Sequence, residues 1–201
     1  MKEKRSVPEN HSGVETNTES ERIFESNASA LAFYKQVRER LLNPNCWHQY
    51  AGKTTADFQL TDEKGNEIER MVQKGDHFRI DIPGPGSDTG NGYDWVRVET
   101  IDEENEGEER FTALRVRPAS NPLNDNEDVA HFFKDDATSS FIVCLQGNKI
   151  KTGVYGRNEK PNTDANKIID KARNAAVATG AISGFAKLQW KSLVEGLLGG
   201  E

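Results

Sequence analysis

The densest hydrophobic run in the chain spans residues 141–145 and predicts the centre of a β-sheet. The run is Phe-Ile-Val-Cys-Leu, a Gly-Asn pair follows at positions 147 and 148, and apolar residues return at Ile150 and Val154. Two such segments around a Gly-Asn pair are typical of a β-hairpin. Polar residues cluster at both ends of this hairpin, where a packed sheet can hold them in fixed positions.

Further short segments of apolar and β-branched residues precede the hairpin. We expect strands over 55–61, 68–72, 77–82, 93–102 and 111–116. Glycine-containing turns separate most of them, and a Pro/Gly-rich loop covers 83–92. Strands that follow one another at short spacing predict a bent, mostly antiparallel, barrel-like sheet of about seven strands.

Helical periodicity appears on both sides of this body. Apolar residues recur at helical spacing over 20–42, and an Asn-Pro-Asn sequence ends the segment. Two more helices are expected over 164–179, capped by Asn162 or Thr163, and over 181–198. The fold class predicted is therefore α+β. Residues 1–20 would form a flexible polar arm, and 21–201 a single domain with a helix in 21–45, a β-rich body in 53–157 and C-terminal helices in 162–199.

Composition supports a polar chain with an uneven charge. Hydrophobic residues make up 34% and charged residues 29% of the 201 residues, and the mean hydropathy is −0.78. The net charge of −7 argues against general nucleic-acid or anionic-membrane binding. Residues 149–191 carry +6, which leaves −13 for the rest. This asymmetry has two explanations: ordinary solvated helix faces, or a head-to-tail or acidic protein partner.

The sequence contains few signals for a cellular compartment or for a cofactor. Cys46 and Cys144 form no CxxC pair, the N-terminus has no apolar signal-peptide core, and no run is long enough to span a membrane, so we expect a cytoplasmic protein. The Gly-Lys-Thr at 52–54 lacks the first P-loop glycine. The acids at 102–107 lack the final calcium-loop Glu, and the four histidines share no ligand spacing. We therefore expect neither a cofactor nor a metal.

One segment carries a catalytic pattern. His131 is followed by Asp135 and Asp136 and by the hydroxyls of residues 138–140. A histidine oriented by a carboxylate beside a hydroxyl is the arrangement used in acyl transfer. The same order occurs in ordinary polar turns, and no GxSxG nucleophile motif is present.

The end of the hairpin and the strand over 93–102 supply the candidate binding residues. Arg157 can grip a carboxylate or phosphate with two hydrogen bonds, and Asn158 and Glu159 follow it on the same turn. In the alternative interpretation, these residues only join the sheet to the helix that follows. Tyr93 and Trp95, at the start of their strand, complete the set of candidate binding residues.

These observations favour a non-enzymatic interaction or structural subunit of a multiprotein assembly. Its partners would be other protein subunits, including further copies of itself. The polar arm, the charge asymmetry, the long Pro/Gly loop and the lack of a complete catalytic motif support this interpretation. Two alternatives stay open: a small hydrolase that uses His131 with Asp135 or Asp136 and Arg157, and a module that binds a ligand or polyanion.

Overall fold

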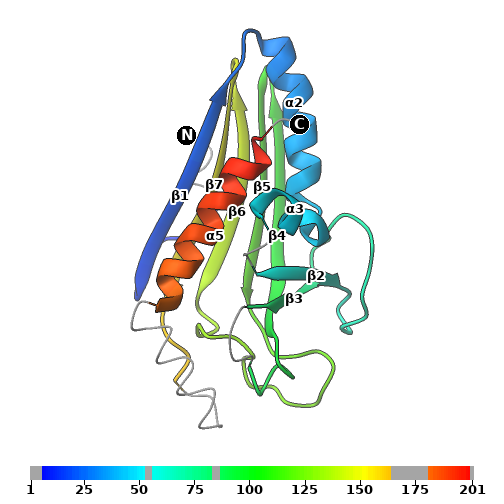
Figure 1. The fold of residues 1–201 in the computed structure, drawn as a ribbon, viewed down its shortest axis with the longest axis vertical. Helices are drawn as coiled ribbons and strands as arrows, with labels where there is room; N and C mark the ends of the chain where they lie inside the picture. Colours follow the sequence, from blue (N-terminus) through cyan, green and yellow to red (C-terminus); the bar gives the residue numbers. More distant parts are fainter. Residues whose placement is uncertain (1–5, 53–55, 83–86, 164–180, 200–201) are drawn as a thin grey trace.

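The fold is an open antiparallel sheet with helices on one face (Figure 1). The computed structural model describes residues 6–52, 56–82, 87–163 and 181–199. The seven strands are β1 (Val14–Ile23), β2 (Asp57–Thr61), β3 (His77–Asp81), β4 (Asp94–Glu106), β5 (Glu109–Pro118), β6 (Thr138–Gln146) and β7 (Lys149–Glu159). Their order is β1-β7-β6-β5-β4-β3-β2, and every pairing is antiparallel.

The predicted α+β fold with seven mainly antiparallel strands is confirmed. Strands β6 and β7 pair around Gly147, whose φ of 60° suits the tight turn of the predicted hairpin. The sheet is not a barrel, however, because β1 and β2 lie at its two edges and do not pair with each other.

The helices are α2 (Asn27–Leu41), the short 3-10 helix η1 (Pro44–Cys46), α3 (Trp47–Ala51) and α5 (Ala181–Leu197). Helix α2 begins at a Ser26–Ser29 capping box, in which each side chain bonds the other residue's backbone N–H. Helix α5 confirms the last predicted helix. The helix predicted over 164–179 lies outside the described residues.

Two elements differ from the sequence-based expectation, although the strand count agrees. Val14–Ile23, expected as the arm and the start of a helix, is edge strand β1 and pairs with β7 along its length. Its residues are polar on both faces, so hydrophobic periodicity could not reveal it. The segment 68–72 is not a strand, because its backbone N–H groups bond separate partners: Ile68 bonds Leu60, and Val72 bonds Leu42.

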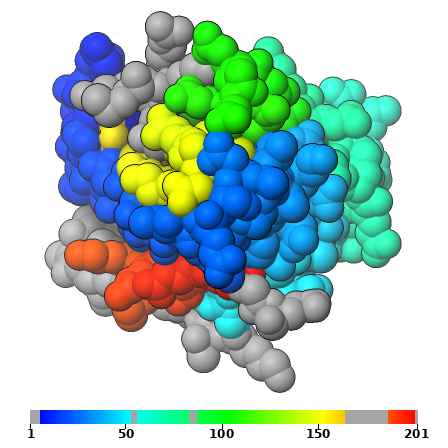
Figure 2. Space-filling view, turned by 90° about the horizontal axis from the view of Figure 1, so that it is seen from above, coloured from blue at the N-terminus to red at the C-terminus, as the bar shows by residue number. Residues whose placement is uncertain are grey.

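The main core lies between the inner face of the sheet and the helices. Trp47 is fully buried, and its ring contacts those of Phe58, Phe78 and Phe141 with centroids 4.7–5.9 Å apart. Around it pack inward-facing residues of every strand from β2 to β7 and residues of α2 and α5. Seen from above, α5 (red and orange) forms a band on one side of the N-terminal segments (blue), and the hairpins (yellow and green) lie on the other (Figure 2).

Two arginines hold the C-terminal end of α5 against the rest of the fold. Arg22 donates to the carbonyl of Leu198, and Arg40 donates to the carbonyls of Leu197 and Gly199. Both guanidinium groups also lie over the ring of Phe33, at 4.9 and 5.5 Å from its centroid. Cations at a helix C-terminus are favourable because they meet the negative end of the helix dipole.

Candidate functional site

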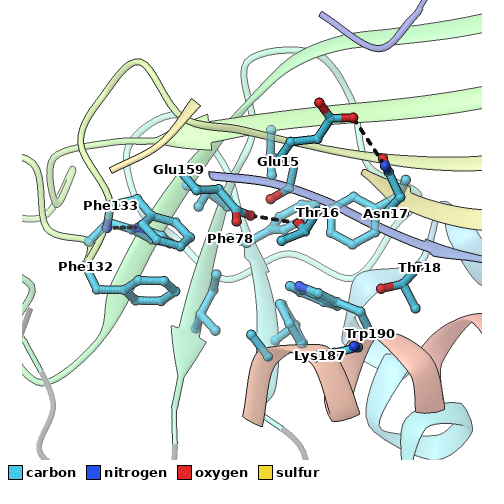
Figure 3. A pocket seen from close by; sticks show the side chains of 18 residues that line it. Glu15, Thr16, Asn17, Thr18, Phe78, Phe132, Phe133, Glu159, Lys187 and Trp190 are labelled. Atoms are coloured by element: carbon cyan, nitrogen blue, oxygen red, sulfur yellow. Dashed lines mark hydrogen bonds between the residues drawn. The ribbon is translucent and has the colours of Figure 1, made fainter. Parts of the chain in front are cut away.

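A cavity of ≈ 580 Å³ lies between the N-terminal half of α5 and the inner face of the sheet (Figure 3). Its walls come from all seven strands, from the segment before β6 and from α5. The lining residues are Glu15, Thr16, Asn17, Thr18, Phe58, Phe78, Ile80, Val96, Val116, His131, Phe132, Phe133, Ser139, Phe141, Glu159, Ala186, Lys187 and Trp190.

Most of the cavity surface is apolar and aromatic. The rings of Phe132 and Phe133 lie at one end, with centroids 4.5 Å apart, and Trp190 of α5 lies at the other (Figure 3). Trp190 contacts the rings of Phe58 and Phe141, at 6.1 and 5.3 Å, which fixes the orientation of its indole. Polar and charged side chains complete the lining, and half of them lie together on β1. An apolar wall with polar groups at defined places is the usual composition of a small-molecule pocket.

Glu159 is turned into the cavity by an irregularity of β7. Inward-facing residues of this strand alternate through Thr152 and Val154, so regular alternation would place Glu159 on the outer face, with Arg157. Asn158 instead has a φ of 56°, in the left-handed region, and the pairing of β1 with β7 shifts register at this point. Such a bulge re-aims a side chain, and here it directs Glu159 inward.

Neighbouring residues hold this irregular backbone and make room for the carboxyl group. The side-chain oxygen of Asn158 accepts from the N–H groups of His11 and Ser12, at 2.8 and 3.2 Å. A Cβ at Gly156 would overlap both the Glu159 carboxyl oxygen and the Thr16 hydroxyl. The absence of a side chain at position 156 therefore leaves the space in which Glu159 lies.

The inward position of Glu159 changes the pKa of its carboxyl group. Burial raises the pKa of its carboxyl group to about 7, against the opposing effects of the Thr16 hydroxyl and of Arg157. The Thr16 hydroxyl donates to Oε1 at 3.2 Å (Figure 3). Glu159 therefore changes charge near neutral pH.

His131 lies on the same cavity in a fixed orientation. Its ring stacks on Phe132, with centroids 4.2 Å apart, and its Nδ1 accepts the N–H of Phe133 at 2.9 Å. Because Nδ1 is an acceptor, the neutral imidazole carries its proton on Nε2. Two residues chosen from the sequence, His131 and Glu159, thus meet at one cavity.

The other residues of the proposed catalytic and anion-binding groups make contacts elsewhere. The backbone oxygen of Asp135 accepts from Arg117, and the Asp136 carboxylate pairs with Lys160 at 3.3 Å. Arg157 donates to two backbone carbonyls and pairs with Glu15 at 3.3 Å. None of these three lines the cavity. Ser139, one of the hydroxyl residues near His131, does line it, and the hydrolase remains a prediction.

Tyr93 and Trp95 also lie apart from the cavity. Trp95 is fully buried and donates its indole N–H to the carbonyl of Gly90. Tyr93 lines a separate polar pocket of ≈ 240 Å³, where the guanidinium of Arg79 lies 4.6 Å from its ring centroid. His48 and Asp57 lie on the same small pocket, 3.6 Å apart.

Several lining residues had weaker sequence signals. Phe132 and Phe133 directly follow His131, and Trp190 belongs to the apolar face of a predicted helix, but core packing explains such residues equally well. Thr16 lies in strand β1, which the sequence pattern did not predict.

Within the described part of the chain, no group of three or more His, Cys, Asp or Glu residues is arranged to hold a metal ion, and no described helix is long and apolar enough to cross a membrane.

Comparison with known proteins defines no family for this chain. No protein-family model matches the sequence, and no curated protein matches it. Among solved structures, a hypothetical protein from Helicobacter pylori has 13% identity and a TM-score of 0.46, over 90% of this chain and 86% of that one. A protein from Mycobacterium smegmatis has 9% identity and a TM-score of 0.46, over 93% and 91%. A protein from Arthrobacter aurescens has 10% identity and a TM-score of 0.43, over 90% and 86%. All three have less than 25% identity and a TM-score below 0.5, so they define neither a family nor a function for this chain.

Proposed function

We propose that the protein binds a small, mainly apolar molecule in the cavity beneath α5. The observation that carries this proposal is the cavity itself, ≈ 580 Å³ in volume and lined mostly by aromatic and aliphatic side chains. Ligand pockets typically occupy about 300–1,000 Å³ and combine an apolar wall with a few polar groups. A fold that needed only stability would be expected to fill this volume, because interiors pack densely and voids are destabilising.

The position of the cavity supports binding as well. It lies between a helix and a sheet, so small movements of α5 would admit a ligand without opening the sheet. The fully packed core around Trp47 adjoins it and keeps the wall residues in place. A rigid wall lowers the entropy lost on binding.

Filling the cavity tests this proposal. Ala186 lines it, whereas Leu188 on the same helix is exposed, with 67% of its surface accessible. We expect Ala186→Trp to weaken binding of a neutral apolar fluorescent probe such as phenylnaphthylamine by about tenfold or more, a change of about 1.4 kcal/mol. The matched control Leu188→Trp should bind the probe like the unmodified protein. Equal binding by both variants, with both folded by circular dichroism, would contradict the proposal.

We propose a role in a protein assembly only as the second candidate. Strand β1 supports it, because it forms a ten-residue edge of the sheet, and edge strands offer backbone groups to another chain. The test is the solution mass of the protein at micromolar concentration, with and without a proline at exposed Asn17. Assembly through β1 predicts a mass above that of the monomer, and its loss in Asn17→Pro. A monomer under both conditions would contradict it.

A further inference from the structure

We infer that the ligand carries a protonated amine next to its apolar body, and that this amine binds the Glu159 carboxylate. The inference rests on the proposed function and names the chemical class of the ligand. Glu159 is the acidic group whose position three local features fix: the left-handed Asn158, the missing side chain at Gly156 and the Thr16 hydroxyl. The left-handed region is uncommon for residues other than glycine, asparagine tolerates it best, and residues in it cluster at functional sites.

Glu159 forms no ion pair with the cationic side chains near it, although Arg157 acts on it electrostatically. Arg157, on the same strand, directs its guanidinium to backbone carbonyls and to Glu15. Lys187 comes from α5 and is exposed at the cavity margin, and His131 uses Nδ1 as an acceptor. Among the described residues, no ion pair reaches the Glu159 carboxylate. A largely buried carboxylate without an ion-pair partner is costly, so a cationic ligand group would offset that cost.

The aromatic walls favour the same class of ligand. Glu159 points into a space bordered by the rings of Phe132 and Phe133 on one side and faces Trp190 across the cavity (Figure 3). Aromatic faces attract ammonium groups, and the attraction is strongest where water is excluded. A carboxylate together with aromatic rings is therefore selective for an amine over a neutral group of the same shape.

The competing arrangement is a neutral Glu159 that donates a hydrogen bond to a carbonyl or carboxylate of the ligand. The two arrangements predict opposite pH dependences. An alkylamine stays protonated up to about pH 9 or above, so its binding should strengthen as Glu159 ionises. A carbonyl ligand held by the protonated acid should bind more weakly over the same range.

Three probes of matched shape distinguish these possibilities: naphthylmethylamine, naphthylmethanol and naphthoic acid. We expect calorimetry at about pH 8 to show the amine binding the unmodified protein about tenfold more tightly than the alcohol, equivalent to about 1.4 kcal/mol. The preference should shrink at about pH 6, below the Glu159 pKa of about 7. Glu159→Gln should remove this preference, and the control Glu21→Gln, at an exposed acid of β1 that does not line the cavity, should keep it.

Each outcome of these titrations either supports or overturns the inference that the ligand carries an amine. Equal binding of amine and alcohol, or tighter binding of the acid, overturns the amine inference but leaves the apolar binding function standing. Failure of all three probes to bind contradicts the proposed function as well. If Glu159→Gln does not fold, the pH dependence of amine against alcohol in the unmodified protein decides alone.

Discussion

The two halves of α5 face different environments. At its C-terminal half Leu193, Val194 and Leu197 are almost fully buried, and Arg22 and Arg40 bind the final carbonyls. Toward its N-terminal end Ala186 and Lys187, together with Trp190 just past the midpoint, border the cavity. One helix thus closes the core at one end and covers an open space at the other.

Stability and ligand binding therefore depend on different parts of α5. Substitutions near the C-terminal half should change the free energy of unfolding and leave ligand affinity intact. Substitutions near the cavity should change affinity at little cost in stability. The exception is Glu159, whose burial affects both.

The largest effect is expected from Trp47→Ala, in the packed core between α3 and the sheet. The side chain is fully buried, contacts three aromatic rings and donates its indole N–H to the carbonyls of Arg40 and Leu41. Removing it should lower the free energy of unfolding by about 3–5 kcal/mol, measured by urea titration. A loss below about 1 kcal/mol, the typical value for an ordinary substitution, would show that the core around Trp47 is not tightly packed.

The pH dependence of stability is the next largest effect, and it should come from the cavity half. Folding raises the pKa of Glu159 from 4.5 to about 7, so the folded state holds the proton more tightly than the unfolded state. The resulting stabilisation is complete below the unfolded pKa and is lost as the pH rises through 7. In the protein without ligand, we expect Glu159 to lower the free energy of unfolding by up to about 3 kcal/mol between about pH 5 and pH 8.

Glu159→Gln provides the matched comparison, because an amide of the same shape does not titrate. Urea titrations of both proteins at the two pH values isolate the Glu159 contribution. A pH dependence that is identical in the variant would contradict the raised pKa.

A smaller effect is expected from Arg40→Ala at the C-terminal end of α5. It removes hydrogen bonds to two carbonyls and the contact of the guanidinium with the Tyr50 ring, whose centroid lies 5.1 Å away. The free energy of unfolding should fall by about 1–2 kcal/mol, with probe affinity unchanged. Lys35→Ala, at an exposed position of α2, is the control and should change little. Weaker probe binding in Arg40→Ala would mean that the two halves are coupled.

The smallest expected effect is that of Gly156→Ala on amine selectivity. The new Cβ overlaps the Glu159 carboxyl oxygen and the Thr16 hydroxyl, so the carboxylate must move. We expect the preference for amine over alcohol to fall by about 1 kcal/mol, or roughly fivefold, in the same calorimetric assay. An unchanged preference would show that amine selectivity does not depend on the position of the Glu159 carboxylate.

The sequence predicted the parts of the molecule that rest on hydrophobic patterning. The β6–β7 hairpin, the α+β class and α5 all carry strong periodic signals, and all are present. Strand β1 was missed because it is polar on both faces and is held by backbone pairing with β7. Segment 68–72 has strand-like composition, but its hydrogen bonds go to separate partners.

The candidate site was predicted only in part, for a comparable reason. His131 and Glu159 were selected by their chemistry, and both border the cavity. That Glu159 faces inward depends on the left-handed backbone of Asn158, which no alternation rule predicts. The cavity itself is a space between α5 and the sheet, and such a space has no signature in the sequence of either element.

The most direct test of the cavity as a binding site is fluorine NMR of protein labelled with fluorotryptophan, titrated with the neutral naphthyl alcohol. The three tryptophans sample the relevant regions: Trp190 borders the cavity, Trp47 lies in the packed core, and Trp95 is buried away from both. Binding in the cavity predicts a saturable shift that is largest for Trp190 and absent for Trp95. A titration that leaves the Trp190 resonance in place, or shifts Trp95 as much, would contradict the account.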